Sequence, residues 1–512
     1  MATRQDGPLQ RIDRHERGAI AIIAAFLVGR LAFAYALGPG IDESYTLAIA
    51  RTLNLSYFDH PPLHQWIVHF AARALGEGFG ARLPFIALFA ATGWMLYRLT
   101  LDLFGARAGV IAVFALNVTP FFFASAGTWI VPDGPLLFGL AAAAWALARL
   151  FFAKPAGRLA IWLLWLAAGA GFGVAGLSKY SATLSVAGLA AFVSLAPGRG
   201  RWLSDPAPYV AAALALAMVT PVFVWNAEHG WASFVFQGAR GSPGPGLKPT
   251  QFLIMALGEI AYLLPWIFAI LVRGLAEAWR ERQDERKFFL FCLALPPIVL
   301  FTLTPLWGAR GLPQWTMPGW FFAYPLLGAW LDERAKSDNA LRRWALVSCG
   351  TLAAAAGIFA LQAATGFPLR LLPVKPGVAD PTLEAFAWRG LRSAPLLTPL
   401  PPFVLSTHWS DAGKIALALG PDAPVFVISD DPRGWAYVAD GGRLLGRDGV
   451  LVARPRDVSS ARAAVALSFK EIGDTRFCTL TRNGAPAVEL ALIPVHGLTR
   501  RLPLPYPGAP GG

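Results

Sequence analysis

The chain has 512 residues, of which 55% are hydrophobic and only 15% charged, and 44 Lys and Arg against 31 Asp and Glu give a net charge of +13. A water-soluble domain carries about 25% charged residues, so this composition excludes a purely soluble protein and also the disordered and collagen-like classes. Nucleic-acid binding is the simplest interpretation of a basic chain. The placement of the charges, described below, argues against it.

Apolar stretches long enough to cross a bilayer recur along the first 363 residues. A window of about 19 residues predicts eleven membrane-spanning helices. They cover residues 19–38, 82–104, 107–125, 133–153, 159–178, 181–196, 207–226, 251–272, 287–305, 315–331 and 343–363. The span 181–196 is the shortest, and losing it would invert the orientation of everything downstream. A cleaved signal peptide is an alternative for the first stretch. We expect an uncleaved helix there, because ten more spans follow.

The short loops between these spans carry their basic residues asymmetrically. With an N-terminal tail (1–18) in the cytoplasm, the loops on that side hold 20 Lys and Arg and the loops on the other side hold 7. Cytoplasmic loops of membrane proteins are enriched in Lys and Arg. The excess positive charge is therefore a topology signal, with anionic lipid head groups as its partner.

The region 364–512 differs from the rest of the chain. A proline-rich linker opens it, and polar and apolar residues then mix as they do in soluble domains. Residues 411–419 predict a short amphipathic helix, and 424–429, 449–453 and 487–493 predict strands. We expect a small α/β domain on the outer face, beyond a membrane domain that covers 19–363. No nucleotide-phosphate loop is present in the sequence, so an energy source in bound ATP is not supported.

Polar residues concentrate in the loops on the outer side. Asp42 and Glu43 follow the first span, and Tyr57, Asp59 and His60 precede a diproline in the same loop. A solvated loop edge and a turn with its cap are the plain alternatives for these groups. The combination of acid, imidazole and aromatic residues beside a stiff backbone favours a functional site.

Three further outer segments carry candidate residues. Asp133 opens a span, where an N-terminal cap is an equally good explanation. Lys179 is the lone charge between two apolar spans, and a lysine so near a span end can also reach the interface without any task. A fourth outer loop has aromatic residues interleaved with polar ones, which is typical of an interfacial belt or of a sugar-contacting surface.

These strings together resemble bacterial members of the dolichyl-phosphate-mannose protein mannosyltransferase superfamily, glycosyltransferase family 39, which are related to the aminoarabinose transferases. The resemblance extends from residue 19 to about 330. It rests on Asp42-Glu43, Tyr57-Phe58-Asp59-His60-Pro61-Pro62, Arg82-Leu83-Pro84, Val131-Pro132-Asp133, Leu177-Ser178-Lys179-Tyr180, Trp225-Asn226 and Trp315-Thr316-Met317-Pro318. Two positions depart from the pattern: Gln314 stands where the family has Asn, and Val131 replaces a threonine, so a hydroxyl that contacts substrate is missing.

The resemblance implies an all-α polytopic membrane protein of the GT-C fold with about 11 transmembrane helices and a smaller C-terminal α/β extracytoplasmic domain. It also implies transfer of a sugar, with inversion, from a polyprenyl-phosphate donor to a hydroxyl acceptor at the periplasmic face of the bacterial inner membrane. Lipid A, a polysaccharide, another lipid or a protein would all serve as acceptor.

Inverting transfer needs one carboxylate base and cations for the departing phosphate. We expect Asp42 to be the base and Glu43 to orient it or a substrate hydroxyl. His60, Arg82 and Lys179 are the candidates for binding the donor phosphate. Asp59 either holds His60 or binds the sugar. The expected substrate-binding residues are Tyr57, Asp59, Asp133, Tyr180, Trp225, Asn226, His229 and Arg240.

Three alternatives stay open at this point. A divalent ion held by Asp59 with His60 or His229 is one, although no fixed metal-ligand spacing supports it. A transporter of lipid-linked sugars shares the many spans, but it would place ionisable residues near the membrane midplane rather than in outer loops. A noncatalytic scaffold would make Asp42 and Lys179 dispensable.

Overall fold

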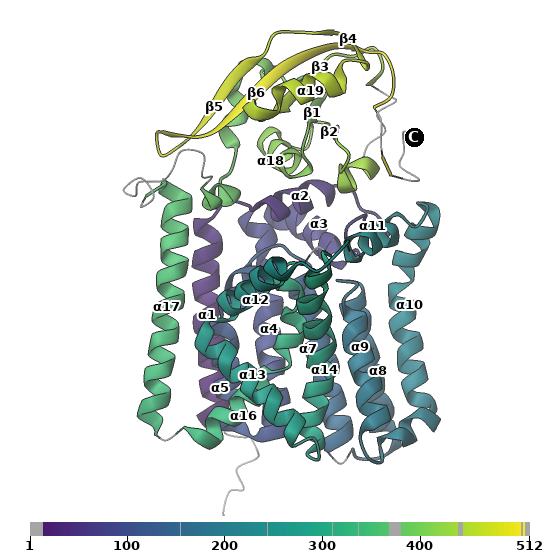
Figure 1. Cartoon of the computed structure of the whole chain (residues 1–512), viewed down its shortest axis with the longest axis vertical. Coiled ribbons are helices and arrows are strands. Elements are labelled where there is room, and N and C mark those ends of the chain that lie inside the picture. The colour runs from purple at the N-terminus through teal and green to yellow at the C-terminus, as the bar shows by residue number, and fades with distance from the viewer. Residues whose placement is uncertain are drawn as a thin grey trace, which may run out of the picture.

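A computed structural model describes residues 14–153, 155–242, 244–309, 311–335, 337–367, 380–438, 444–502 and 505–506. Figure 1 shows a bundle of long helices with a smaller domain, which contains a sheet, at one end of it. The predicted tail (1–18) lies outside the described residues up to residue 13, and the first helix begins at Arg14. The predicted linker lies outside them at residues 368–379. The predicted division at residue 364 stays a prediction.

Seven helices among the described residues are long and apolar enough to cross a membrane. At 1.5 Å per residue, 20 helical residues match the hydrocarbon thickness of about 30 Å. The seven are α1 (Arg14–Ala36), α4 (Phe79–Phe104), α7 (Asp133–Phe152), α8 (Arg158–Gly176), α10 (Pro206–Glu228), α14 (Glu285–Leu303) and α17 (Asp338–Thr365). Each covers one of the predicted spans, and the chain is a multi-pass membrane protein.

Two predicted spans are broken by proline. The segment predicted as 107–125 consists of α5 (Ala106–Val118), a π-helical turn (Phe121–Ser125) and α6 (Ala126–Thr128), with a bend of 82°. The segment predicted as 251–272 consists of α12 (Pro249–Leu263) and α13 (Pro265–Arg280), bent by 103°. Proline has no N–H to donate and pushes the residue before it out of the α region. Each of these two predicted spans is therefore a bent pair of helices rather than one continuous helix.

Two other predicted spans are short helices inside the bundle. The segment 181–196 is α9 (Ala182–Leu195), which packs on α14. The segment 315–331 contains α15 (Met317–Phe321) and α16 (Tyr324–Arg334), and α16 packs on α5 and α13. All eleven predicted segments are thus helical, although only seven to nine of them meet the length expected of a span in the part of the chain described.

The first outer loop folds into helices rather than staying irregular. It forms α2 (Ile41–Ile49) and α3 (Leu63–Leu75), and the later outer loop forms α11 (Ala232–Gly241). Figure 1 shows these three short helices between the bundle and the sheet domain. They form a layer between the two domains, in which Asp42 and Glu43 lie on α2 and Arg240 lies on α11.

The C-terminal domain is a six-stranded mixed sheet with a helix on each face. Its strands are β1 (Val404–Ser406), β2 (Val425–Val427), β3 (Gly449–Ala453), β4 (Phe469–Ile472), β5 (Arg476–Arg482) and β6 (Ala485–Leu498), and its helices are α18 (Trp409–Leu419) and α19 (Val458–Val465). The order is β2-β1-β3-β6-β4, with β5 also paired to β6. The first three strands are parallel and β6 is antiparallel to its neighbours.

The side chains of each strand alternate between the two faces of the sheet, and this explains why a helix packs on each face. On β1, Val404 packs in the cluster that contains Ile415 of α18, and the next residue, Leu405, packs in the cluster that contains Val465 of α19. Successive side chains of a strand point to opposite faces, so each face needs its own cover. The predicted helix and three predicted strands are present, and the fold class predicted from the sequence is confirmed. Figure 1 shows α18 between the sheet and α2.

Candidate active site

A cavity of about 570 Å³ lies where the layer of short helices meets the C-terminal domain. Its walls come from α2, from the segment around Asp59, from the break between α5 and α7, and from α11 and α12. The C-terminal domain contributes Glu384, Ala385, Trp409 and Arg433. The site is therefore shared between two domains.

The adjacent acids Asp42 and Glu43 have opposite environments. Consecutive residues of a helix point about 100° apart. Asp42 is exposed to the cavity, and no described residue forms a hydrogen bond with its carboxylate. Glu43 is 2% exposed and accepts the Gly40 N–H at 2.8 Å, which caps α2. One acid faces substrate space and the other faces protein.

Glu43 is held by Arg82 of α4. The Arg82 Nε lies 2.7 Å from Glu43 Oε1, and a terminal nitrogen lies 2.5 Å from Oε2. The Ile130 N–H also donates to Oε1 at 3.0 Å. Burial alone would raise the pKa of Glu43, but Arg82 and the two backbone donors bring it below its ordinary value. Glu43 is ionised and fully bonded.

All five N–H donors of Arg82 are bonded within the protein, although the sequence predicted that Arg82 binds the donor phosphate. A guanidinium has five N–H donors. Two of those of Arg82 go to Glu43 and the others to the carbonyls of Ala34, Leu37 and Gly38. It is 1% exposed and is not among the residues that line the cavity. In this structure Arg82 fixes the end of α1 and the loop to α2, and it has no donor left for a phosphate.

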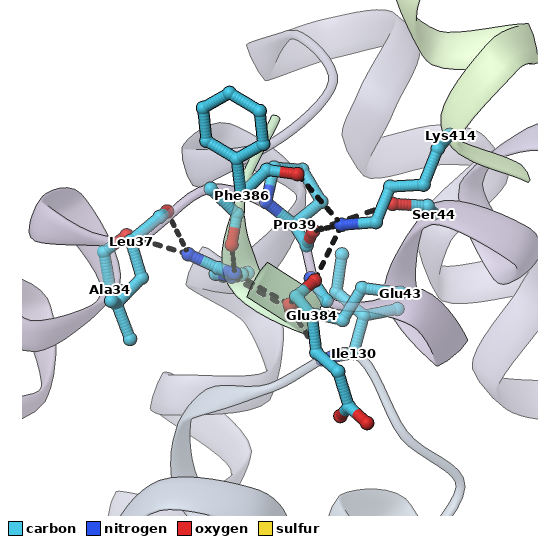
Figure 2. Close-up of polar contacts among 12 residues, drawn as sticks. Ala34, Leu37, Pro39, Glu43, Ser44, Ile130, Glu384, Phe386 and Lys414 are labelled. Carbon is cyan, nitrogen blue, oxygen red and sulfur yellow. Dashed lines mark hydrogen bonds and ion pairs between the residues drawn. The ribbon is translucent and has the colours of Figure 1, made fainter. Parts of the chain in front are cut away.

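Lys414 of α18 fastens the same loop from the C-terminal domain. Its ammonium group donates to the carbonyl oxygens of Pro39, Glu384 and Phe386, as Figure 2 shows. Burial lowers the pKa of Lys414 to about 8, and Glu43 and Glu384 oppose that shift. The three carbonyls take all three ammonium donors. The loop that precedes Asp42 is thus held from below by Arg82 and from above by Lys414.

The electrostatics at Asp42 suit a general base. Protein surrounds Asp42 on most sides, and this loss of bulk water raises its pKa, whereas Arg433 opposes the rise and Glu43 adds to it. A carboxylate with a raised pKa accepts a proton more readily than an ordinary one. Burial and the nearby Asp42 also raise the pKa of Glu384, a second acid that lines the cavity.

Asp59 is a buried acid without hydrogen bonds. It is 3% exposed and lines the cavity, and no hydrogen bond of normal geometry reaches either carboxylate oxygen. Burial raises the pKa of Asp59 to about 6, although Arg433 and the Tyr45 hydroxyl act in the opposite direction. Unsatisfied buried oxygens are costly. Their presence in a cavity wall marks a place where a ligand group would bind.

His60 lines the cavity as a neutral ring. Its ring lies 5.7 Å from that of His64, edge to face, and burial followed by His64 lowers the pKa of His60 well below its ordinary value. No hydrogen bond joins His60 to Asp59, so that expected pairing is absent. A neutral imidazole offers a hydrogen bond to a phosphate but no charge.

Lys179 and Asp133 form an ion pair in the cavity wall. The Lys179 Nζ lies 2.9 Å from Asp133 Oδ1, and both side chains are largely buried. Pro132 rather than Asp133 occupies the cap position of α7, and Asp133 lies in the first turn, where a carboxylate also suits the helix dipole. The pairing removes the explanation that Lys179 merely reaches toward the interface. The structure brings together two residues that are 46 positions apart.

Five of the predicted substrate-binding residues do not line the cavity. They are Tyr57, Tyr180, Trp225, Asn226 and His229. Trp225 stacks on the His229 ring at 4.1 Å, and the Asn226 amide bonds the Val222 carbonyl and the Ser233 N–H. These contacts join α10 to α11. The five residues lie outside the cavity lining, and their contact with substrate stays a prediction.

Arg240 lines the cavity as expected, and the sequence interpretation missed several of its neighbours. His64 and Gln65, in the first turn of α3, also line it. Arg433, Trp409 and Glu384 come from the C-terminal domain. No local motif marks them, because only the docking of the two domains brings them to the cavity.

No group of three or more His, Cys, Asp or Glu that could hold a metal ion occurs within the described ranges. Of the residues suggested for a divalent ion, Asp59 and His60 line the cavity and His229 does not. The His229 Nδ1 lies 2.7 Å from the Trp225 carbonyl oxygen. The arrangement gives no support to the suggested pairing of Asp59 with His229.

Comparison with known proteins gives consistent matches. Residues 59–225 match the family described as dolichyl-phosphate-mannose-protein mannosyltransferase. The lipid A galacturonosyltransferase RgtD of Rhizobium johnstonii is 24% identical over 311 residues, which are 57% of this chain and 60% of that protein. The undecaprenyl phosphate-alpha-4-amino-4-deoxy-L-arabinose arabinosyl transferase of Pseudomonas aeruginosa is 27% identical over 349 residues, 65% of this chain and 59% of that protein. The matches thus span about 60% of the length of these curated relatives.

Solved structures match over almost the whole chain. ArnT from Cupriavidus metallidurans in the apo state gives a TM-score of 0.63 at 16% identity and covers 93% of this chain and 98% of that one. The same protein bound to undecaprenyl phosphate gives a TM-score of 0.64 at 17% identity, with 93% and 97% covered. These likenesses establish the fold, including the placement of a C-terminal domain on the bundle. The chain is thus a multi-pass membrane protein that shares its fold with ArnT and is similar, over residues 59–225, to the dolichyl-phosphate-mannose-protein mannosyltransferase family.

Proposed function

We propose that the protein is an inverting glycosyltransferase that moves a sugar from a polyprenyl-phosphate donor to a hydroxyl group of a cell-envelope acceptor. The observation that carries the proposal is the unpaired carboxylate of Asp42 in a cavity that also holds Lys179, Arg240 and Arg433. A base and several cations in one enclosed space meet the demands of this reaction. The names of the relatives, which are transferases for lipid A or from undecaprenyl phosphate, support the same class.

Transfer would proceed in one displacement. The acceptor hydroxyl gives its proton to Asp42, and its oxygen forms a bond to the anomeric carbon from the face opposite the phosphate. The bond between that carbon and the phosphate oxygen breaks, and polyprenyl phosphate leaves with the electron pair. The phosphate needs no general acid as long as cations stabilise its charge. Of the phosphate candidates predicted from the sequence, Lys179 and the neutral His60 line the cavity, and Arg240, predicted to bind substrate, is a second cation there.

The apolar part of the cavity suits a lipid tail. Phe121 lies at the break after α5, Tyr262 lies near the break between α12 and α13, and Phe359 lies on α17. Broken helices are tolerated inside a membrane where they line a cavity. A polyprenyl chain that runs down this wall from the phosphate would stay in contact with apolar side chains and lipid.

The proposed location is the bacterial cytoplasmic membrane, with the cavity and the C-terminal domain in the periplasm. Support comes from the sequence, in which the loops predicted on the cytoplasmic side hold 20 Lys and Arg and those predicted on the outer side hold 7. The polar residues of the site gather at the end of the bundle that meets the C-terminal domain rather than at mid-bundle, which favours an enzyme over a transporter.

Mass spectrometry of lipid-linked sugars and envelope glycans tests the proposal. Cells would carry the wild-type protein, Asp42→Asn, no protein, or the control Asp474→Asn, which replaces an exposed acid of the C-terminal domain. We expect one glycan to vanish, and its lipid-linked sugar to accumulate, with Asp42→Asn and without the protein. The control should match the wild type. An envelope that is the same in all four strains would overturn the proposal.

A further inference from the structure

Arg433 stands out among the cations of the cavity because the protein leaves its guanidinium unbonded. It begins a 3-10 turn (Arg433–Tyr437) of the C-terminal domain, lines the cavity, and has a side chain that is 16% exposed. No described residue accepts a hydrogen bond from this guanidinium. Its ion pair is a long one, from Nε to Asp431 Oδ2 at 3.6 Å, and Tyr506 donates to the other Asp431 oxygen at 2.5 Å.

Arg454 of the same domain is an arginine whose guanidinium is paired with an acid, and it serves as a comparison. The Arg454 guanidinium lies 4.8 Å from the Trp388 ring centre and forms two hydrogen bonds with Asp411, at 2.7 and 2.8 Å. The Arg433 guanidinium likewise lies over a tryptophan, Trp409, at 4.0 Å. Unlike Arg454, Arg433 has no carboxylate that accepts two hydrogen bonds from its guanidinium among the described residues. The attraction between a cation and an aromatic face holds the Arg433 guanidinium beside Trp409 without using its N–H donors in hydrogen bonds to acceptor oxygens.

A second arginine lies close to it. The Phe236 ring of α11 has the Arg240 guanidinium at 5.4 Å and the Arg433 guanidinium at 5.7 Å from its centre. One arginine belongs to the membrane domain and the other to the C-terminal domain, and both line the cavity. Both cations act on the carboxylates of Asp42 and Asp59, so the four charged groups share one space, and an anionic ligand that touches both guanidiniums would gain from two positive charges.

A backbone contact next to Arg433 sets its position relative to Asp42. Arg433 has a φ of 52°, an uncommon value for a residue with a side chain. The next residue, Gly434, donates its N–H to the Tyr45 hydroxyl at 2.8 Å, and a Cβ at Gly434 would lie 2.4 Å from that oxygen. Tyr45 is one helical turn after Asp42 on α2. The contact therefore positions the cation relative to the proposed base.

We propose that Arg433 binds an anionic oxygen group of the lipid-linked donor, with Trp409 as its positioning residue. The inference rests on the proposed function and adds a substrate-binding residue from the C-terminal domain. Two donor groups have the required chemistry: the phosphate that joins sugar to lipid, and the carboxylate of a uronic acid, if the sugar is one. Both present paired oxygens to a guanidinium fork.

Binding to the purified full-length protein tests the proposal with two probes, undecaprenyl phosphate and an undecaprenyl-phosphate-linked hexuronic acid. The variants are Arg433→Gln, the conservative Arg433→Lys, and the control Arg456→Gln, whose side chain is 83% exposed in the same domain. We expect Arg433→Gln to weaken binding of at least one probe roughly 10- to 100-fold. Arg433→Lys should recover part of that loss, and Arg456→Gln should bind as the wild type does.

The two probes separate the sources of the anion. Equal weakening for both assigns Arg433 to the phosphate, and weakening for the hexuronic acid probe alone assigns it to the sugar carboxylate. Wild-type affinity of both Arg433 variants for both probes overturns the inference and leaves the proposed function standing. A wild-type protein that binds neither probe overturns the proposed function as well. Thermal unfolding of each variant shows that the folded protein is being compared.

Discussion

Asp42 and Glu43 are neighbours in the chain and opposites in the structure. Glu43 accepts two bonds from Arg82 and two from backbone N–H groups, whereas Asp42 faces the cavity with no hydrogen bond. A helix turns about 100° per residue, so adjacent acids cannot share an environment. The comparison teaches that a motif of two acids combines two tasks: one acid builds the site and the other is available for chemistry.

The same division separates the basic residues. Arg82 and Lys414 have every donor bonded within the protein and hold the loop between α1 and α2. Lys179 is paired with Asp133 but lines the cavity, and the Arg433 guanidinium has a long ion pair with Asp431 and no hydrogen bond to a described residue. Charge alone does not identify a substrate contact. The number of donors still unbonded does.

The largest expected effect on stability comes from Glu43→Gln. The change leaves the Arg82 guanidinium buried without its counter-charge, and breaking one partner of a buried ion pair costs about 3–5 kcal/mol. Thermal unfolding in detergent should occur at a clearly lower temperature than for the wild type, whereas Asp42→Asn should unfold as the wild type does. If Glu43→Gln keeps the wild-type unfolding temperature and loses only turnover, the division between the two acids is wrong.

Asp59→Asn should raise the stability of the folded protein, whereas Glu43→Gln lowers it. Burial raises the pKa of Asp59 from 3.8 to about 6. Between these pH values the folded protein keeps a proton that the unfolded chain has released, so stability falls as pH rises through that window and stays lower above it. At pH 7.5 the substitution should therefore stabilise the free protein by about 3 kcal/mol and weaken donor binding. An unfolding temperature that is equal for both proteins at pH 4 and at pH 7.5 would contradict the prediction.

Lys179→Met should affect the donor more than the chemical step. Loss of a charged hydrogen bond to phosphate is expected to weaken donor affinity roughly tenfold. Because the change also leaves Asp133 unpaired, the double variant Lys179→Met with Asp133→Asn is the matched control for local repulsion. Steady-state kinetics with varied donor should show a raised KM. An unchanged KM in both variants would restrict Lys179 to holding Asp133.

The smallest effect is expected from Lys414→Met, which removes one contact between the two domains. Three carbonyl oxygens lose their donor, while the Tyr45–Gly434 contact keeps the domains together. We expect faster amide hydrogen exchange at the start of α2 and a kcat lowered a few-fold, with donor affinity unchanged. Exchange at wild-type rates would mean that Arg82 alone fixes the loop.

Much of this arrangement could be predicted from the sequence. Apolar length and the positions of Lys and Arg located all eleven helical segments, because the bilayer imposes one length on every span. Asp42, Asp59, Asp133, Lys179 and Arg240 were singled out as polar residues in outer loops, and all five line the cavity. Unusual residue types at membrane depth are informative because burying them is costly.

The remainder depends on contacts between distant residues. The aromatic residues Trp225 and His229 matched a sugar-binding pattern, yet they stack on one another behind the wall. No local sequence pattern distinguishes Arg433 from other loop arginines. It lines the cavity only because the C-terminal domain contacts α2. The bend at Leu264 and Pro265 was visible as a proline but was outweighed by the apolar length of the stretch. The residue types along the sequence predict which side chains are buried, but they do not predict which partner each side chain contacts.

Turnover at saturating donor tests the central claim most directly. The measurement is the rate at which purified wild-type and Asp42→Asn proteins release undecaprenyl phosphate from the lipid-linked sugar that accumulates in cells lacking activity. With Asp42 as the base, the variant should bind this donor with wild-type affinity, unfold at the wild-type temperature and turn over roughly 10²- to 10⁴-fold more slowly. Turnover within a few-fold of the wild type would show that the unpaired acid is not the base.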